Sequence, residues 1–209
     1  MSQYYKEYKH LCFYTLGHPF DGFYDMRRGG RAKSSYVILI FSIYVLLQII
    51  SYLFTGFMVN DNDQSKFNAL SILTTSLFPF LLFVLANYSI TTLSDGKGFM
   101  KDIINTVAYS LLPMIVCHTI ALIISWFITT DTMVFYSIFI VFGWISFIFY
   151  CFIGLIVVHE YTFFRGILYL FLSFIAMAVI LFIGILLITL FQQLIGFFTS
   201  IWREIILRK

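Results

Sequence analysis

The histidine, cysteine and acidic residues of this sequence are the side chains that could bind a metal or transfer a proton. His159 and Glu160 begin like the helix of a zinc protease, but the residue four positions after the histidine is phenylalanine, so the second ligand is missing. His10, Cys12 and His18 could share a metal, yet their spacing matches no familiar zinc site. We therefore expect no metal, no cofactor and no catalytic residue, and we predict that the protein is not an enzyme.

A second group of polar residues lies inside long apolar stretches, where such side chains suggest a functional site. The candidates are Gln48, Asn87, Asn105, Tyr109 and His118. His118 could belong to a proton relay, but the apolar stretches contain no carboxylate that could pair with it. We therefore favour a neutral His118 that hydrogen-bonds to a neighbouring helix.

The apolar stretches themselves predict the fold class. Five of them contain no Asp, Glu, Lys or Arg, and they cover residues 35–58, 69–93, 103–128, 133–158 and 167–190. Each is long enough for a helix that crosses a hydrocarbon core about 30 Å thick. Apolar residues make up 61% of the chain and charged residues 11%, against about 45–50% and about 25% in soluble domains. The sequence predicts an all-α fold, a polytopic transmembrane bundle of five spans over residues 34–190, with no room for a soluble catalytic domain.

The charged residues exclude one class of partner and predict an orientation. A net charge of +3 is too small to suggest nucleic-acid binding. If the N-terminus is cytoplasmic, nine Lys and Arg residues lie on the cytoplasmic side and four on the other side. The positive-inside rule therefore favours a cytoplasmic N-terminus and an external C-terminus.

An N-terminal segment, residues 1–33, precedes the first apolar stretch. Helical spacing over residues 19–28 brings Phe20, Phe23 and Tyr24 to one face, after a proline that suits the first position of a helix. This aromatic face is typical of a short amphipathic helix at the level of the lipid headgroups. The alternative is an irregular tether before the first span.

A C-terminal segment, residues 191–209, follows the fifth apolar stretch and differs from it in pattern. A helix there places Phe198 and Trp202 on an apolar face, and Gln193 and Ser200 on a polar one. Such an amphipathic helix suits a membrane surface or the groove of a partner. Two placements remain open: the helix lies on the membrane, or it continues the fifth span.

Three segments carry a resemblance to a known family. They read HPFDGFYD at residues 18–25, DGKGFMKD at residues 95–102 and AYSLLP at residues 108–113. In this order, and with five spans, they resemble the bacterial branch of the Yip (Ypt/Rab-interacting protein) family. The glycine turn followed by a helix with a Tyr-x-x-x-Pro motif is the most specific part.

The resemblance implies partners and a location. The eukaryotic branch implies a cytoplasmic N-terminus and roles in vesicle traffic through small GTPases. This chain lacks the long N-terminal domain of those members, so we do not expect a small GTPase as a partner. Genes of the bacterial branch often lie beside those of sugar-uptake ABC importers, which implies a bacterial plasma-membrane protein and an importer permease as its partner.

We predict a non-enzymatic accessory or scaffold protein that binds another integral membrane protein, with that permease as the candidate partner. The candidate contacts are Phe20, Phe23, Tyr24, Gly96, Lys97, Gly98, Phe198 and Trp202. One alternative is a small transporter or channel, whose cavity the polar residues inside the apolar stretches would line. A second alternative is a protein that binds membrane lipid or shapes the membrane through its two amphipathic helices.

Overall fold

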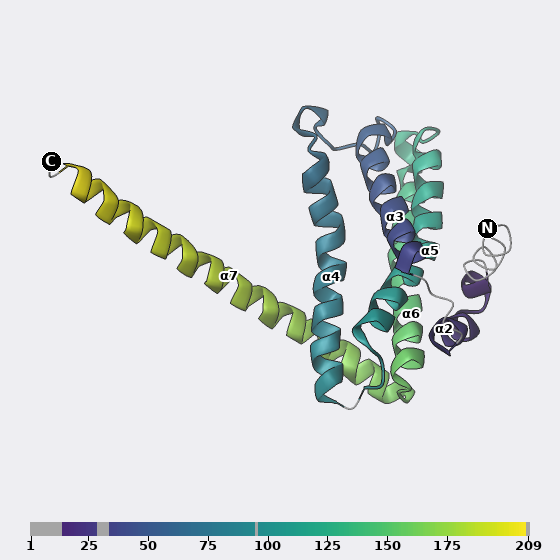
Figure 1. Ribbon diagram of the computed structural model, residues 1–209. Coiled ribbons are helices and arrows are strands. Elements are labelled where there is room, and N and C mark those ends of the chain that lie inside the picture. The colour runs from purple at the N-terminus through teal and green to yellow at the C-terminus, as the bar shows by residue number, and fades with distance from the viewer. Residues whose placement is uncertain (1–13, 29–33, 95, 208–209) are drawn as a thin grey trace.

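The computed structural model describes residues 14–28, 34–94 and 96–207, and every regular element in these ranges is a helix (Figure 1). The elements are α2 (Pro19–Arg28), α3 (Ser34–Phe54), η1 (Gln64–Lys66), α4 (Ala69–Leu93), α5 (Met100–Ser125), η2 (Thr130–Thr132), α6 (Met133–His159) and α7 (Phe163–Leu207). Helices α3 to α7 are each long and apolar enough to cross a membrane. The all-α bundle with five spans is therefore confirmed. His10 and Cys12, two of the metal candidates, lie outside the described residues.

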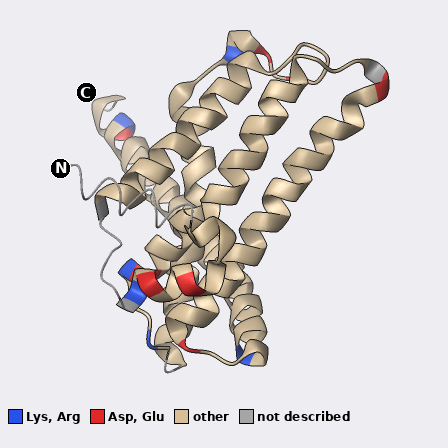
Figure 2. Ribbon diagram, turned by 90° about the vertical axis from the view of Figure 1, so that its right-hand side faces the viewer, with Lys and Arg blue, Asp and Glu red and all other residues tan. Residues whose placement is uncertain are grey.

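Different connections between the helices lie at the two ends of the bundle. At one end lie the α4–α5 connection and the α6–α7 turn, with α2 beside them; we call this the α2 end (Figure 1). The α3–α4 and α5–α6 connections lie at the opposite end. Figure 2 shows the charged residues at these two ends, on α2 and near the C-terminal end of α7. The segments predicted to be cytoplasmic thus share one end, and the side of the membrane that this end faces stays a prediction.

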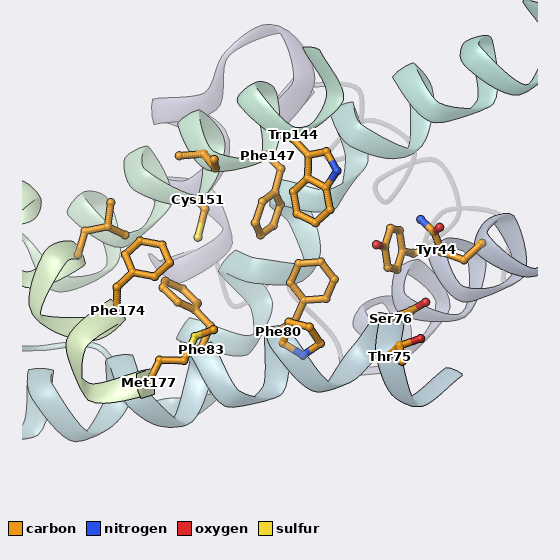
Figure 3. A pocket seen from close by; sticks show the side chains of 14 residues that line it. Tyr44, Thr75, Ser76, Phe80, Phe83, Trp144, Phe147, Cys151, Phe174 and Met177 are labelled. Atoms are coloured by element: carbon orange, nitrogen blue, oxygen red, sulfur yellow. The ribbon is translucent and has the colours of Figure 1, made fainter. Parts of the chain in front are cut away.

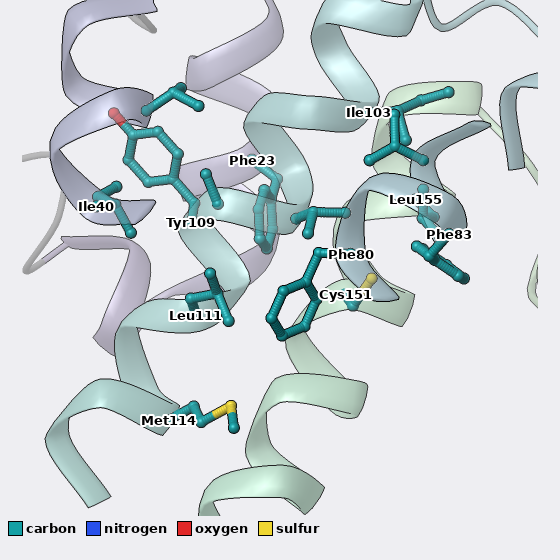
Figure 4. Packing of buried hydrophobic residues seen from close by; sticks show 14 of the residues in the cluster. Phe23, Ile40, Phe80, Phe83, Ile103, Tyr109, Leu111, Met114, Cys151 and Leu155 are labelled. Atoms are coloured by element: carbon teal, nitrogen blue, oxygen red, sulfur yellow. The ribbon is translucent and has the colours of Figure 1, made fainter. Parts of the chain in front are cut away.

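Helix α5 is the centre of the bundle. It packs against α3, α4 and α6, and more than half of its most apolar stretch is buried. Its buried side chains include Tyr109, Leu111 and Met114. Figure 4 shows them in one apolar cluster with Phe23 of α2 and Phe80 of α4. The core therefore forms around α5, and α2 contributes a side chain to it.

The ends of the spans follow local hydrogen bonding. Asn68 caps α4, because its Oδ1 accepts hydrogen bonds from the backbone N–H groups of Leu70 and Ser71. The first apolar stretch was expected to continue to residue 58, but α3 ends at Phe54. The reason is Gly56, whose N–H donates to Ser125 Oγ at 2.9 Å and whose backbone packs so closely on α5 that a side chain there would overlap the Ser125 carbonyl. This contact turns the chain away from the helix axis.

Helix α7 is the longest element of the fold. Its 45 residues correspond to a length of about 67 Å, more than twice the thickness of a hydrocarbon core. The helix has no break between Phe163 and Leu207, so the C-terminal segment continues the fifth span, one of the two placements that the sequence left open. In Figure 1 its first part crosses α4, and the rest extends away from the bundle.

Candidate functional site

Charged and aromatic side chains join three segments at the α2 end. We call this group the junction: Arg27 on α2, Lys97 in the α4–α5 connection, and His159, Glu160 and Tyr161 at the α6–α7 turn. Glu160 Oε1 accepts a hydrogen bond from Arg27 Nη1 at 2.9 Å, and its Oε2 accepts one from Lys97 Nζ at 2.7 Å. The hydrogen bond and charge of Lys97, supported by Arg27, hold the pKa of the Glu160 carboxyl below its ordinary value. The ionised carboxylate therefore connects α2 and the α4–α5 connection to the α6–α7 turn.

The glycine turn of the α4–α5 connection packs against the same turn. Gly98 N donates to His159 Nδ1 at 3.3 Å, and the His159 ring stacks on Tyr161 with centroids 5.2 Å apart. A Cβ atom at Gly98 would lie 2.6 Å from Val158 Cγ1, and one at Gly96 would lie 2.5 Å from the Tyr161 hydroxyl oxygen. Both positions therefore need glycine, because the backbone lies against α6 and the α6–α7 turn of its own chain. A role for Gly96, Lys97 and Gly98 in binding a partner stays a prediction.

The three aromatic residues of α2 do not share one environment. Phe23 is fully buried, and its ring lies against Gly154 of α6, where a Cβ atom would come within 3.0 Å of Phe23 Cε1. Phe20 and Tyr24 are exposed, with 58% and 48% of their surface accessible. The helix predicted over residues 19–28 is confirmed, but of its aromatic residues only Phe20 and Tyr24 are open to a lipid or a partner.

The polar residues predicted inside the membrane lie at separate helix contacts. Asn87 Nδ2 donates to Ser173 Oγ at 2.9 Å, which joins α4 to α7. Asn105 and Tyr109 are buried within α5, and Tyr109 belongs to the apolar core. His118 is buried beside α6, where a Cβ atom at Gly143 would lie 2.8 Å from His118 Cδ2. These positions suit contacts between helices, which small and polar residues commonly form in membranes.

Gln48, another member of this predicted set, lines a cavity. The cavity has a volume of about 520 Å³ and lies between α3, α4, α6 and α7. Aromatic residues of α4 and α6, among them Phe80, Trp144 and Phe147, form much of its wall (Figure 3). Sequence patterns suggested a cavity beside Gln48 only as an alternative and did not indicate its aromatic lining, because that lining comes from four helices whose relative rotation no periodicity reveals.

The distal part of α7 is a second candidate site. Every residue from 185 to 207 is exposed, and we call this stretch the α7 arm (Figure 1). A Cβ atom added at Gly184, directly before the arm, or at Gly196 within it, would meet no atom within 4 Å. Phe198 and Trp202, two of the predicted contacts, are 66% and 67% exposed. The arm therefore offers about 34 Å of helix to its surroundings.

The junction contains the residues that sequence reasoning missed. Arg27, His159 and Glu160 were read as basic, ligand-like or loop residues, without a structural relation between them. One signal was available, since Glu160 is the only acidic residue between the fourth and fifth apolar stretches. Among the described residues, no group of three or more His, Cys, Asp or Glu could hold a metal ion.

These observations define an integral membrane protein of the polytopic α-helical class. The model of the Yip1 domain family matches residues 13–185, and the chain therefore belongs to this family. The match covers α2 to the first half of α7 and stops where the α7 arm begins. No curated protein and no solved structure matches the chain.

Proposed function

We propose that the protein is a non-enzymatic accessory protein that binds another integral membrane protein through the α7 arm. The observation that carries the proposal is the exposure of every residue in this arm. The arm is rigidly continuous with a span that α4 holds in place through the hydrogen bond between Asn87 and Ser173. An exposed helix with such an anchor can reach a neighbouring protein without loss of the bundle.

The chemistry of the arm favours a membrane partner. Gln193, Gly196 and Ser200 lie along one face, at positions i, i+3 and i+7. Glycine allows two helices to approach closely, and amide or hydroxyl groups in a membrane gain by hydrogen-bonding to a second helix. The opposite face carries Phe198 and Trp202, whose large rings are typical anchors at membrane interfaces and in protein contacts.

The resemblance described above supports a more specific partner and location. We propose that the partner is the permease of a sugar-uptake ABC importer in the bacterial plasma membrane, with the α2 end on the cytoplasmic side. Phe20 and Tyr24 would form a secondary contact at that end, because they are the exposed aromatic residues of α2.

Co-purification tests the proposal directly. The tagged full chain is extracted from native membranes with a mild detergent, and importer permeases are detected among the retained proteins. We expect a variant that ends at residue 190 to lose the permease while the five spans remain inserted. The double substitution Phe198→Ala with Trp202→Ala should weaken the complex about thirtyfold or more, since truncated aromatic anchors commonly cost about 2 kcal/mol.

The matched control is Phe191→Ala with Leu187→Ala, two changes on the same arm nearer to the bundle. We expect this double variant to retain more of the complex than the double variant at Phe198 and Trp202. Recovery of the full chain without a permease, under conditions that preserve other membrane complexes, would contradict the proposal. A solute flux through the reconstituted chain alone would favour the transporter alternative instead.

A further inference from the structure

The cavity beside Gln48 has two chemically different sides. Figure 3 shows Tyr44 of α3 and Thr75 and Ser76 of α4 at one side of it, and Gln48 lies beside Tyr44. Figure 3 shows Phe83, Phe174 and Met177 at the other side, with aromatic side chains between. All its lining side chains are uncharged, so the cavity is polar at one end and apolar along the rest: Tyr44, Gln48, Thr75, Ser76, Pro79, Phe80, Phe83, Trp144, Phe147, Ile148, Cys151, Leu170, Phe174 and Met177.

The polar side retains hydrogen-bonding capacity for a ligand. The amide of Gln48 lies beside the Tyr44 hydroxyl, and an amide group has both donor and acceptor positions. The Thr75 hydroxyl donates to the backbone oxygen of Ser71 at 2.9 Å, which leaves its oxygen free to accept. A ligand with hydroxyl or ester oxygens would complement this group, whereas a charged headgroup would find no counter-ion among the lining side chains.

The position of the cavity indicates where such a ligand would come from. Along α4 the lining extends from Thr75 to Phe83, which corresponds to about 12 Å, less than half of a hydrocarbon core. The polar side lies toward the α3–α4 connection, whereas Cys151 of α6 and Leu170 of α7 lie nearer to the α2 end, so the cavity runs from its polar side into the interior of the bundle. Its volume of about 520 Å³ falls within the range of small-molecule sites, about 300–1,000 Å³. A transmembrane helix of a partner would not fit in this space.

We infer that the cavity binds an uncharged single-chain lipid of the monoacylglycerol type. Its glycerol or ester oxygens hydrogen-bond to Gln48 and Ser76, and its acyl chain lies along Phe80 toward Phe83 and Met177. The lipid enters from the leaflet next to the α3–α4 connection, with its polar group at the depth where Gln48 and Ser76 place theirs. This site is independent of the α7 arm, because none of its lining residues belongs to the arm.

Tryptophan fluorescence provides the test, because Trp144 lines the cavity. In a background with Trp126→Phe and Trp202→Phe, Trp144 is the only tryptophan of the chain. The full chain in detergent is titrated with a monoacylglycerol whose acyl chain carries two bromine atoms, a short-range quencher. We expect saturable quenching of Trp144 that unbrominated monoacylglycerol reverses.

Two variants of α4 separate a bound lipid from lipid that merely surrounds the protein. Ser76→Phe fills the polar side of the cavity and should abolish the saturable quenching. Ser89→Phe is the matched control, because Ser89 is an exposed residue of the same helix that does not line the cavity, and it should leave the quenching unchanged. Gln48→Leu keeps the volume, removes the amide and should weaken binding about fivefold.

The headgroup is tested with two further brominated lipids, a fatty acid and a phosphatidylcholine. We expect both to quench Trp144 without saturation in the concentration range of the monoacylglycerol. Equal, saturable quenching by the fatty acid or the phosphatidylcholine would overturn the assignment of an uncharged single-chain lipid. Quenching that never saturates, or that is the same in Ser76→Phe and Ser89→Phe, would overturn the site itself.

Discussion

Helices α5 and α7 differ most among the helices of this protein. They reverse the rule of soluble proteins that the most apolar segments are the most buried. Helix α7 contains the most apolar stretch of the five spans, yet none of that stretch is buried. Helix α5 contains the least apolar one, and more than half of it is buried. In a bilayer the apolar surroundings are lipid, so a purely apolar helix gains nothing by burial, whereas polar and small residues gain partners by it.

The same contrast separates the glycines of the two regions. Gly154 of α6 lies against Phe23 and Thr106, and a Cβ atom there would overlap the Thr106 methyl group. Gly184 and Gly196 of α7 have open space around them. Gly154 in the bundle therefore allows a close contact between helices of this chain. Gly184 and Gly196 of α7 leave room for a contact with another molecule.

Substitution of these glycines gives the largest expected effect. Gly154→Leu should lower the free energy of unfolding by about 3 kcal/mol, because the new side chain displaces Phe23 from the core. Gly184→Leu should leave it unchanged or raise it slightly, since the helix loses a glycine and the side chain meets only lipid. The measurement is the unfolding of both variants in mixed micelles, followed by circular dichroism. Equal destabilisation by the two substitutions would show that α7 packs on the bundle at Gly184, directly before the arm.

A pair of serines on α7 sharpens the comparison within one helix. Ser173→Ala should cost about 1 kcal/mol, because it leaves the buried amide of Asn87 without the Ser173 hydroxyl. Ser200→Ala should have no effect on the isolated protein, since the Ser200 hydroxyl bonds only to the backbone oxygen of Gly196 in its own turn. The same unfolding measurement compares both variants with the unaltered chain. An effect of Ser200→Ala on stability would indicate that the arm already has a partner in the micelle, such as a second copy.

The sequence was sufficient to predict the elements but not their contacts. The uncharged stretches gave five spans, and α2 was predicted to the residue, because each of these elements follows from local composition or helical spacing. Span ends were less accurate where a distant residue decides them, as at Gly56, which the end of α5 holds in place. The continuous course of α7 was left open, because Gln193 and Arg203 made its last part look different from a span.

The candidate contact residues differ in exposure, and the rotation of each helix decides which of them are exposed. Phe198 and Trp202 are exposed, as a contact surface requires, while Phe23 faces the core although it shares its helical spacing with Phe20 and Tyr24. A pattern of aromatic residues cannot say which part of an aromatic face meets protein and which part meets lipid. That distinction depends on how α2 is rotated against α6, and thus on contacts such as the one between Phe23 and Gly154.

The junction allows the smallest of the expected effects, a dependence of stability on pH. The pKa of Glu160 is lower in the folded protein than in the unfolded chain, mainly because of the hydrogen bond and charge of Lys97. A carboxyl group with a lowered pKa stabilises the fold at pH values above its unfolded pKa of about 4.3, and this stabilisation disappears as the pH falls through the folded pKa. The thermal unfolding midpoint should therefore fall between pH 6 and roughly pH 3 by a greater amount in the unaltered chain than in Glu160→Gln.

The control for this prediction is a carboxyl group of the arm. Glu204→Gln removes one acid from a segment that does not contact the junction, so its profile of unfolding midpoint against pH should follow that of the unaltered chain. The pH dependence of the unfolding midpoint of Lys97→Ala should lie between that of the unaltered chain and that of Glu160→Gln, because Arg27 still pairs with the carboxylate. If Glu160→Gln and Glu204→Gln gave the same profile, the ion pairs of the junction would contribute nothing measurable, as is common for ion pairs near a protein surface. The packing of His159 against Gly98 and Tyr161 would then be the interaction that holds the α2 end together.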